Sequence, residues 1–482
     1  MTKVTELRNL IGTDGGLIVE LTPFLHRELP ESLYSQLYHW IKKEIEEGRL
    51  LPGMKMPSIR QLTAHLKVSR NTVEAAYQQL QAEGYLESVP KSGIWVAEIE
   101  KPLLHPIEGE HPIRLECKPS SEVLVDFEYG NVDLDKFPLK KWKKCLSEAV
   151  DQENNWLFQY SEKQGELALR REISNYLLQF RGVRSSPEQI LITAGTQNSI
   201  ALICRLLALQ GKSVAMEEPG YSGARSVFED QGCYIEPVPL EKDGLSVEHI
   251  QTSKAKAVYL TPSHQFPFGM ILSILKRMRL LKWAYQTGGY IIEDDYDGEF
   301  RYQGQPIPSL KSLDEEEKVI YLGTFSKSFL PSVRLSYIVF PPSLMDQYLL
   351  KFAAYNQSVS PIIQRAMALF MQSGEFERHI RRMRRLYQRK HQALLRNIEQ
   401  YMGNRVKIVG EKSGLHILLK LKGISTFELI ENGLQKGVKV YSPLMFWLHT
   451  TPESNSYIML GFGGLSIEEI DKGVRLLASC LT

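Results

Sequence analysis

A lysine at position 327 stands in a segment that could carry out covalent chemistry. The segment reads TFSKSFLPSVR and follows the apolar run KVIYLG, so Lys327 comes shortly after an expected strand, between Ser326 and Ser328. Arg334 follows a few residues later. An amine held near charged partners can condense with an aldehyde, although most lysines are only solvated surface groups. Whether Lys327 does such chemistry therefore depends on the side chains that accompany it.

A carboxylate and a phenol follow another apolar run further upstream. The run GYIIED ends in Asp294, and Asp295 and Tyr296 come next. A carboxylate at the carboxyl end of a parallel strand can keep a ring nitrogen protonated, because opposite charges at short range stabilise both ionised forms. Tyr296 could donate a hydrogen bond to a ring hydroxyl. The alternative is that the acidic pair caps the strand or faces water.

A candidate anion site lies where the run QILITAG meets the helical stretch TQNSIALICRLLAL. The backbone of Gly195 and the side chains of Thr196 and Gln197 could contact a phosphate there, because free N–H groups and the dipole at a helix N-terminus favour anions. A plain N-cap at Thr196 would explain the same residues. Tyr221, in EEPGY, could stack on a flat ring or pack against its own domain. Together with the lysine and the carboxylate, these groups predict pyridoxal 5′-phosphate as the cofactor.

The elements that must position these residues alternate between strand and helix from about Val123 onward. Short apolar runs such as SVAMEE, AKAVYLT and RLSYIVF are separated by helical stretches such as LSILKRMRLLKWAYQ. This pattern predicts an α/β domain over 123–482, with a mainly parallel sheet covered by helices on both faces. Its C-terminal part, from about 345, mixes long helices with a few strands, which predicts a smaller α+β lobe.

A different, mainly α-helical module precedes this domain. We expect helix, helix, helix and hairpin between Glu31 and Trp95, which is the order of a winged helix-turn-helix; the module spans 28–97 and a linker spans 98–122. Five cationic and no acidic side chains lie between Arg49 and Val73, a one-sided charge that suits phosphate contacts. The alternative is a packing module without DNA. The candidate DNA-binding residues are Ser58, Arg60, Ser69, Arg70, Asn71, Thr72, Tyr77, Lys91 and Gly93.

Composition limits the class of protein. The chain has 482 residues, a net charge of +2 and five cysteines without a C-x-x-C pair, so it fits neither a disulfide framework nor a zinc site, and no metal site is expected. No stretch approaches the length of an apolar membrane span, and the start does not read as a secretion signal. We expect a cytoplasmic protein without a membrane partner.

Motifs in both parts resemble known families. MPSIRQLTAHLKVSRNTVEAAYQQLQAEGYLESVPKSGIWVA resembles the winged-helix DNA-binding domain of the GntR family. The ordered set AGTQ, EEPGY, TPSHQFPFG, IIEDDYDGEF and TFSKSFLPSVRLSY resembles the α/β fold-type-I aminotransferases, which depend on pyridoxal phosphate. A fusion of the two is the plan of the MocR regulators, and the chain is similar to their GabR and PdxR branch.

The resemblance implies a role for each candidate. Lys327 would bind the cofactor covalently, Asp294 its ring nitrogen, Tyr296 its ring oxygen and Tyr221 its ring face. The phosphate would be held by Arg334, Ser326, Gly195, Thr196 and Gln197. Tyr160, in LFQYSEKQGELALRREISNYL, would reach the cofactor of a neighbouring subunit, which implies a homodimer.

The chain also departs from the aminotransferase pattern. Gly463 and Gly464 stand where an arginine that clamps the substrate carboxylate is expected, and Phe266 replaces the asparagine that contacts the ring oxygen. The GABA-responsive relatives carry a second arginine where this chain has Ser222 and Gly223, and Arg225 comes two positions late.

These departures predict a sensor rather than an enzyme, with at most a half-transamination. Pyridoxal phosphate itself would be the signal, and genes of vitamin B6 synthesis the target. The alternative is an amino-acid, amine or dipeptide effector, with Arg225 or His264 as first candidates; a working aminotransferase is less favoured. The partners are operator DNA, a second copy of the chain and, as a further candidate, RNA polymerase. Activation and repression are both left open.

One further segment is rich in arginine. RHIRRMRRLYQRK, residues 378–390, reads as the solvated face of a helix, and the alternative is an additional contact with DNA phosphates.

Overall fold

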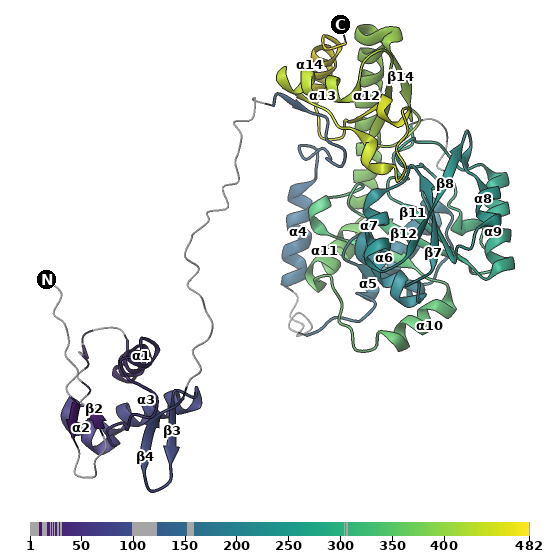
Figure 1. The fold of residues 1–482 in the computed structure, drawn as a ribbon. Helices are drawn as coiled ribbons and strands as arrows, with labels where there is room; N and C mark the ends of the chain where they lie inside the picture. The colour runs from purple at the N-terminus through teal and green to yellow at the C-terminus, as the bar shows by residue number, and fades with distance from the viewer. Residues whose placement is uncertain are drawn as a thin grey trace. The chain divides into compact units, whose positions relative to one another are not determined.

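The computed structural model describes residues 31–98, 123–151, 159–302, 304 and 307–481, with a few positions between 9 and 28. The chain divides into two compact units, Met1–Cys117 and Lys118–Thr482 (Figure 1). The expected linker falls outside the described residues except for Glu98. Within the described ranges no helix has the length and apolar character that crossing a bilayer requires.

The first unit has the expected order of helices and wing. Helices α1 (Leu33–Glu46), α2 (Ile59–Leu66) and α3 (Arg70–Ala82) precede the antiparallel strands β3 (Leu86–Val89) and β4 (Gly93–Val96). Ser58 begins α2 with a capping box that includes Gln61, and Ser69 caps α3 by accepting a hydrogen bond from Thr72 N. A short hairpin, β1 (Asn9–Ile11) with β2 (Leu17–Val19), was not expected.

Burial explains why these short helices are stable together. Each helix turns one apolar stripe inward, and the residues of these stripes form one core that also takes up the inner side of the wing. The core includes Leu37, Ile41, Leu62, Val73, Ala76, Tyr77, Leu80, Leu86 and Val96.

The second unit is built on an eight-stranded sheet, in the order β6-β13-β12-β11-β10-β7-β8-β9. The strands are β6 (Ile190–Thr193), β7 (Ser213–Glu218), β8 (Tyr234–Glu241), β9 (Gly244–Leu245), β10 (Ala257–Leu260), β11 (Tyr290–Asp295), β12 (Val319–Thr324) and β13 (Ser336–Val339). Strands β8, β7, β10, β11 and β12 are parallel to their neighbours in this run, which confirms the mainly parallel sheet. Strand β13 is antiparallel to both of its neighbours, and β9 to β8.

Helices cover both faces of this sheet, because every central strand is apolar on both sides. Helices α6 (Thr196–Leu206), α7 (Ser222–Asp230) and α10 (Pro342–Lys351) pack on one face. Helices α4 (Leu139–Val150), α5 (Leu167–Arg181), α8 (Val247–Thr252), α9 (Ile274–Thr287) and α11 (Pro361–Gln372) cover the other. Figure 1 shows these layers around β7, β8, β11 and β12.

The C-terminal lobe begins later than the sequence suggested. Helices α10 and α11 belong to the core of the large domain, so the lobe starts with α12 (Glu375–Met402) rather than near residue 345. It contains β14 (Val406–Val409), β15 (His416–Leu421), α13 (Thr426–Gln435), β17 (Tyr457–Gly461) and α14 (Ile467–Ala478). Strand β5 (Val125–Asp126), far away in the sequence, pairs with β16 (Val438–Lys439) and joins this lobe. Amphipathicity alone could not assign α10 and α11, because either core would accept their apolar faces.

Candidate cofactor and DNA-binding sites

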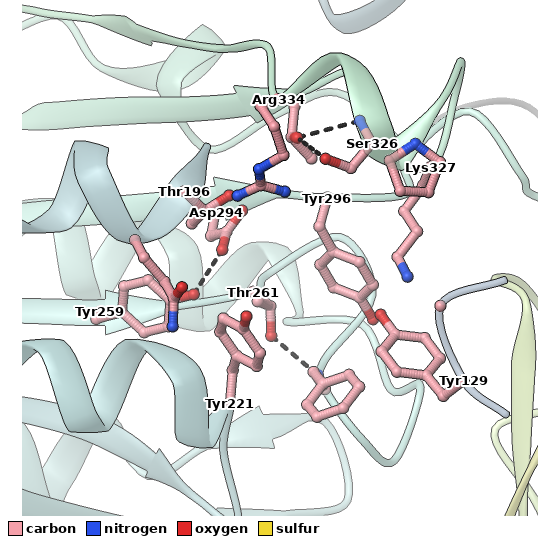
Figure 2. Close-up of a pocket in the computed structure, with 15 residues that line it drawn as sticks. Tyr129, Thr196, Tyr221, Tyr259, Thr261, Asp294, Tyr296, Ser326, Lys327 and Arg334 are labelled. Atoms are coloured by element: carbon pink, nitrogen blue, oxygen red, sulfur yellow. Dashed lines mark hydrogen bonds between the residues drawn. The ribbon is translucent and has the colours of Figure 1, made fainter. Parts of the chain in front are cut away.

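A cavity of about 330 Å³ lies at the carboxyl ends of the strands in the second unit. It collects side chains from segments far apart in the sequence, as in other α/β sheets that bind ligands at this edge (Figure 2). The lining residues are Tyr129, Gly130, Thr196, Gln197, Tyr221, Tyr259, Thr261, Phe266, Asp294, Tyr296, Thr324, Ser326, Lys327, Pro331 and Arg334. The structure therefore brings together eight of the residues that the sequence singled out for a cofactor.

Lys327 lies in the turn after β12 and points into this cavity (Figure 2). Its Nζ is 4.1 Å from the centroid of the Tyr129 ring. Burial lowers the pKa of Lys327 to about 8, although the charges of Asp297 and Glu128 act to raise it. A larger share of this amine is therefore neutral near pH 7 than of a solvated lysine, which makes it a better nucleophile.

Asp294, near the end of β11, is buried on the opposite side of the cavity. One carboxylate oxygen, Oδ2, accepts a hydrogen bond of 2.5 Å from the Tyr259 hydroxyl. The other oxygen, Oδ1, is buried without a hydrogen-bond partner among the described residues. Burial, assisted by Asp295, Asp297 and Glu293, raises the pKa of Asp294 to about 7. A buried, unpaired carboxylate oxygen beside a cavity suits a ligand with a cationic N–H, such as a protonated pyridine nitrogen.

The expected anion site is formed where α6 begins. Gly195 precedes the helix with a φ of 100°, and a Cβ there would overlap Nη2 of Arg334, so only glycine lets the guanidinium approach the helix N-terminus. Ser326 lies nearby, where its backbone N–H donates to Thr324 Oγ1 at 3.2 Å. Together with Thr196 these groups provide the donors and the positive charge that a phosphate needs.

Aromatic rings form the remaining walls. The rings of Tyr221 and Phe266 have centroids 5.8 Å apart, and Phe446 of the C-terminal lobe packs edge-on against Phe266 at 4.6 Å. Tyr129 and Tyr259 also line the cavity and were missed by sequence reasoning. Tyr259 lies inside an apolar strand, and Tyr129 follows a short strand of the other lobe, so neither carries a local signal.

Four predicted residues do not line the cavity, and one of them, Gly195, lies next to it at the start of α6. Tyr160 is 88% exposed. Arg225 donates from Nη2 to Met445 O at 2.6 Å and from Nη1 to Phe446 O at 3.4 Å, so its guanidinium holds the C-terminal lobe. His264 is buried behind Tyr296, with its Nδ1 2.9 Å from the tyrosine hydroxyl. Arg225 and His264 are therefore held by other groups of this chain and do not point into the cavity as effector-binding residues would.

The glycines at the expected carboxylate clamp are closely packed. A Cβ on Gly463 would overlap the carbonyl oxygen of Asn131, and one on Gly464 would lie 2.9 Å from the Asn131 Cβ. An arginine at either position would need a shift of the backbone around Asn131. The absence of the clamp is therefore built into the packing of the lobe.

In the winged helix, most candidate DNA-binding residues are exposed. Arg60, Arg70, Asn71 and Lys91 all face solvent, and Arg70 is 77% exposed on its side chain, 3.6 Å from Glu74. Ser58, Ser69, Thr72 and Gly93 lie beside them, with the Ser69 and Thr72 hydroxyls 2.8 Å apart in the cap of α3. Ser69, Arg70, Asn71 and Thr72 place donors around the first turn of α3, the position from which a recognition helix reads DNA, whereas Ser58 and Arg60 lie at the start of α2 and Lys91 and Gly93 in the wing.

Two expectations about this surface are corrected. Tyr77 is buried, with 1% of its surface exposed, and its hydroxyl donates to Pro57 O at 3.0 Å, so it supports the core instead of contacting DNA. Arg49 pairs with Glu44 and Glu47, which reduces the one-sided positive charge expected from the sequence. Both corrections arise because the partners are brought together only by helix packing.

We predict that Arg70→Ala weakens binding to a selected DNA fragment about 10-fold or more, because a contact from a recognition helix typically contributes 1–3 kcal/mol. Fluorescence anisotropy at fixed salt measures this loss. Arg49→Ala is the matched control, since its guanidinium is already engaged in ion pairs. Equal losses in both variants would contradict the assignment of α3.

The arginines of α12 give another prediction. Arg381 is 62% exposed on its side chain and lies 3.8 Å from Glu377, and Arg385 is also exposed. We expect the double charge reversal Arg381→Glu with Arg385→Glu to leave the affinity for a short half-site unchanged, because a solvated helix face makes no contact with it. A clear loss of affinity in the same anisotropy assay would instead indicate additional phosphate contacts.

Comparison with known proteins agrees with both parts of the fold. Residues 122–456 match the family described as aminotransferase class I and II, and residues 33–96 match the bacterial regulatory proteins of the gntR family. Kynurenine aminotransferase of Pyrococcus horikoshii, solved in complex with PMP, is similar with a TM-score of 0.67 and 28% identity over 75% of this chain and 91% of that chain. Relatives of this domain depend on pyridoxal phosphate, which is therefore its cofactor, and the cavity around Lys327 and Asp294 suits it.

Relatives that span both parts are transcriptional regulators. YdeL of Bacillus subtilis is 41% identical over 462 residues, which cover 95% of this chain and 99% of YdeL. MocR of Rhizobium meliloti, named as a probable rhizopine catabolism regulatory protein, is 31% identical over 94% of this chain and 95% of MocR. PdxR of Corynebacterium glutamicum, named as a pyridoxine biosynthesis regulator, is 31% identical over 93% of this chain and 95% of PdxR. The chain therefore belongs to the MocR-type transcriptional regulators, in which a GntR winged helix is joined to a pyridoxal-phosphate-dependent aminotransferase-like domain.

Proposed function

We propose that pyridoxal phosphate is not only the cofactor of this regulator but also its signal. One observation carries the proposal: the cavity offers groups for every part of the cofactor, yet Arg334 is the only arginine among its described lining residues. Gly463 and Gly464 leave no room for a second one, and Arg225 is engaged with backbone carbonyls. An amino-acid carboxylate therefore lacks the bidentate partner that it has in aminotransferases.

Each side chain has a physical task in this proposal. Lys327 would hold the aldehyde covalently, since its lowered pKa supplies neutral amine. Asp294 accepts from the protonated ring nitrogen through its unpaired oxygen. Tyr221 stacks on the ring, Tyr296 faces its oxygen, and Arg334 with the start of α6 holds the phosphate. The bound aldehyde supplies an electron-poor ring joined covalently to the protein, whose formation we expect to alter DNA affinity.

The target genes and the assembly are part of the proposal. The relative named for pyridoxine biosynthesis supports control of vitamin B6 synthesis. MocR, with the same identity, is named for rhizopine catabolism, so the proposal rests on the cavity rather than on the names of relatives. We propose that the regulator acts as a homodimer on a double-stranded operator. The exposure of Tyr160 supports this, because its hydroxyl is free of the cavity of its own chain and can serve a neighbouring one.

A titration tests the proposal. A DNA fragment selected for binding to the regulator is titrated with cofactor-free protein and with protein supplied with pyridoxal phosphate, each as wild type and as Lys327→Ala. We expect the cofactor to change the affinity of the wild type and to leave that of the variant unchanged. Equal binding in all four conditions would remove the sensor from the proposal.

A working aminotransferase is the second candidate, and the intact set of Lys327, Asp294 and Tyr296 favours it. Incubating the loaded protein with a panel of amino acids and amines, and following the absorbance of the cofactor, separates the two. Conversion that stops after a single exchange of the amino group, or no conversion, agrees with the sensor. Repeated turnover with a keto-acid acceptor would assign an enzyme.

A further inference from the structure

A chain of buried polar side chains backs Tyr296 on the side away from the cavity. Its hydroxyl lies 2.9 Å from Nδ1 of His264 and 3.1 Å from the carbonyl oxygen of the same residue. The same Nδ1 lies 2.9 and 3.1 Å from the two carboxylate oxygens of Asp297. His264 and Asp297 are each 3% exposed, so water does not compete for these contacts.

The network fixes where the protons lie. A carboxylate can only accept, so Nδ1 of His264 carries a hydrogen and donates towards Asp297 and the Tyr296 oxygen. The Tyr296 hydroxyl therefore donates its own hydrogen to another acceptor, and the carbonyl oxygen of His264 is the one within reach. When an acceptor enters the cavity, this proton can turn to it, while Nδ1 continues to donate to the tyrosine oxygen.

The other ring nitrogen of His264, Nε2, is buried without a hydrogen-bond partner among the described residues. His264 also lines a small cavity of about 10 Å³, enough for one water. Arg181 and Arg301 line the same cavity. His416, packed against His264 at 5.7 Å, is itself neutral at pH 7, because burial lowers its pKa to about 4.

Close packing holds the imidazole in this orientation. Gly414 has a φ of 81°, and a Cβ there would overlap Cε1 of His264 and lie 2.8 Å from Oδ2 of Asp297. His416 also donates from Nε2 to Pro267 O at 2.9 Å, which fixes the loop that carries His264. The ring therefore has little freedom to leave Tyr296.

We propose that Asp297 and His264 are positioning residues that make Tyr296 a directed hydrogen-bond donor to the ring oxygen of the bound cofactor. This inference rests on the proposed covalent site at Lys327. The neighbouring wall supplies no other donor from its side chain, because Phe266 is a hydrocarbon ring there. The relay would set the pH at which the cofactor bound to Lys327 changes its protonation and its colour.

Asp297→Asn tests the relay, because an amide N–H turned towards Nδ1 favours the tautomer in which Nδ1 carries no hydrogen and accepts a hydrogen bond from the Tyr296 hydroxyl. Tyr296 would then donate to His264 instead of to the ring oxygen of a bound cofactor, and with less stabilisation of negative charge there a higher pH would be needed to remove the proton held next to Lys327. We expect the pH midpoint of the absorbance change of the loaded protein to rise by about one unit, the size expected for one hydrogen bond to a charged group.

The sign of the shift separates the relay from a simple field effect. The charge of Asp297 raises the pKa of Lys327, as does that of Glu128, so loss of charge alone would lower the midpoint. Glu128→Gln is the matched control, since Glu128 lines a different cavity and bonds to Asn131. It should lower the midpoint slightly or leave it unchanged. A fall or no change in Asp297→Asn would overturn the relay.

Two further comparisons keep the test decisive. Combining Asp297→Asn with Tyr296→Phe should give a midpoint no higher than that of Tyr296→Phe alone, because the relay acts through the hydroxyl and only the loss of charge remains; a further rise would contradict the relay. His264→Asn, whose amide can lie near the place of Nδ1, should shift the midpoint less than His264→Gln.

Failure of the relay and failure of the covalent site give different results. If wild-type protein stays colourless with pyridoxal phosphate, the covalent site itself is wrong; a coloured protein without these shifts removes only the relay.

Discussion

Replacing Lys327 with alanine should leave a protein that never acquires the visible absorbance of a covalently bound aldehyde and whose DNA affinity no longer responds to pyridoxal phosphate. The reason is that no other described residue lining the cavity carries a primary amine. DNA affinity without the cofactor should stay close to that of the wild type, because the winged helix forms a separate compact unit. Absorbance spectra and anisotropy titrations on the same preparation measure both effects.

Lys327→Arg is the matched control for charge. It retains a cation near Tyr129 and Asp297 but has no amine that condenses with an aldehyde. We expect it to behave like Lys327→Ala in both assays. If either variant retained the full cofactor response, the signal would depend on non-covalent binding or on another site, and the role of Lys327 would be wrong.

Asp294→Asn should have opposite effects on cofactor affinity and on the stability of the cofactor-free protein. Affinity should fall on the order of 100-fold, because the amide cannot form an ion pair with the protonated ring nitrogen and loses a charge-assisted hydrogen bond of about 2–3 kcal/mol. Equilibrium dialysis, or a titration of the absorbance with cofactor, measures this change.

The stability effect depends on pH in a defined direction. In the cofactor-free protein burial raises the pKa of Asp294 from 3.8 to about 7, so the folded chain binds this proton more tightly than the unfolded chain. This contribution to stability is fully present below pH 3.8 and is lost as the pH rises through about 7. Asparagine does not ionise, so the variant should gain in melting temperature relative to the wild type as the pH rises from 5 towards 8.

Glu293→Gln is the control for this pair of effects. Glu293 precedes Asp294 in β11, faces the opposite side of the sheet, and accepts from the backbone N–H groups of Leu310 and Lys311. Burial also raises its pKa to about 7, so the substitution should change the pH dependence of stability without weakening cofactor binding. Comparable losses of cofactor affinity in both variants would mean that Asp294 acts only through the fold.

Local patterns in the sequence determined the site residues that lie at the ends of strands. Lys327, Asp294, Tyr221 and Thr196 each follow an apolar run closely, and the carboxyl ends of parallel strands meet at one edge of a sheet. Knowledge of the strands therefore sufficed to predict that these side chains converge. Helix patterns identified the recognition helix α3 and its cap in the same way, because both depend on neighbours in the sequence.

Only the tertiary structure decided which partners these residues meet. Tyr259 reaches Asp294 from another strand, Tyr77 turns into the core, Arg225 binds carbonyls of the C-terminal lobe, and His264 supports Tyr296 from behind. Each of these contacts joins segments that are distant along the chain or depends on the rotation of a helix about its axis. Hydrogen bonds and burial are set by distance in space, so residue types and their spacing identified the chemistry of the site and its missing carboxylate clamp, whereas packing determined its electrostatics.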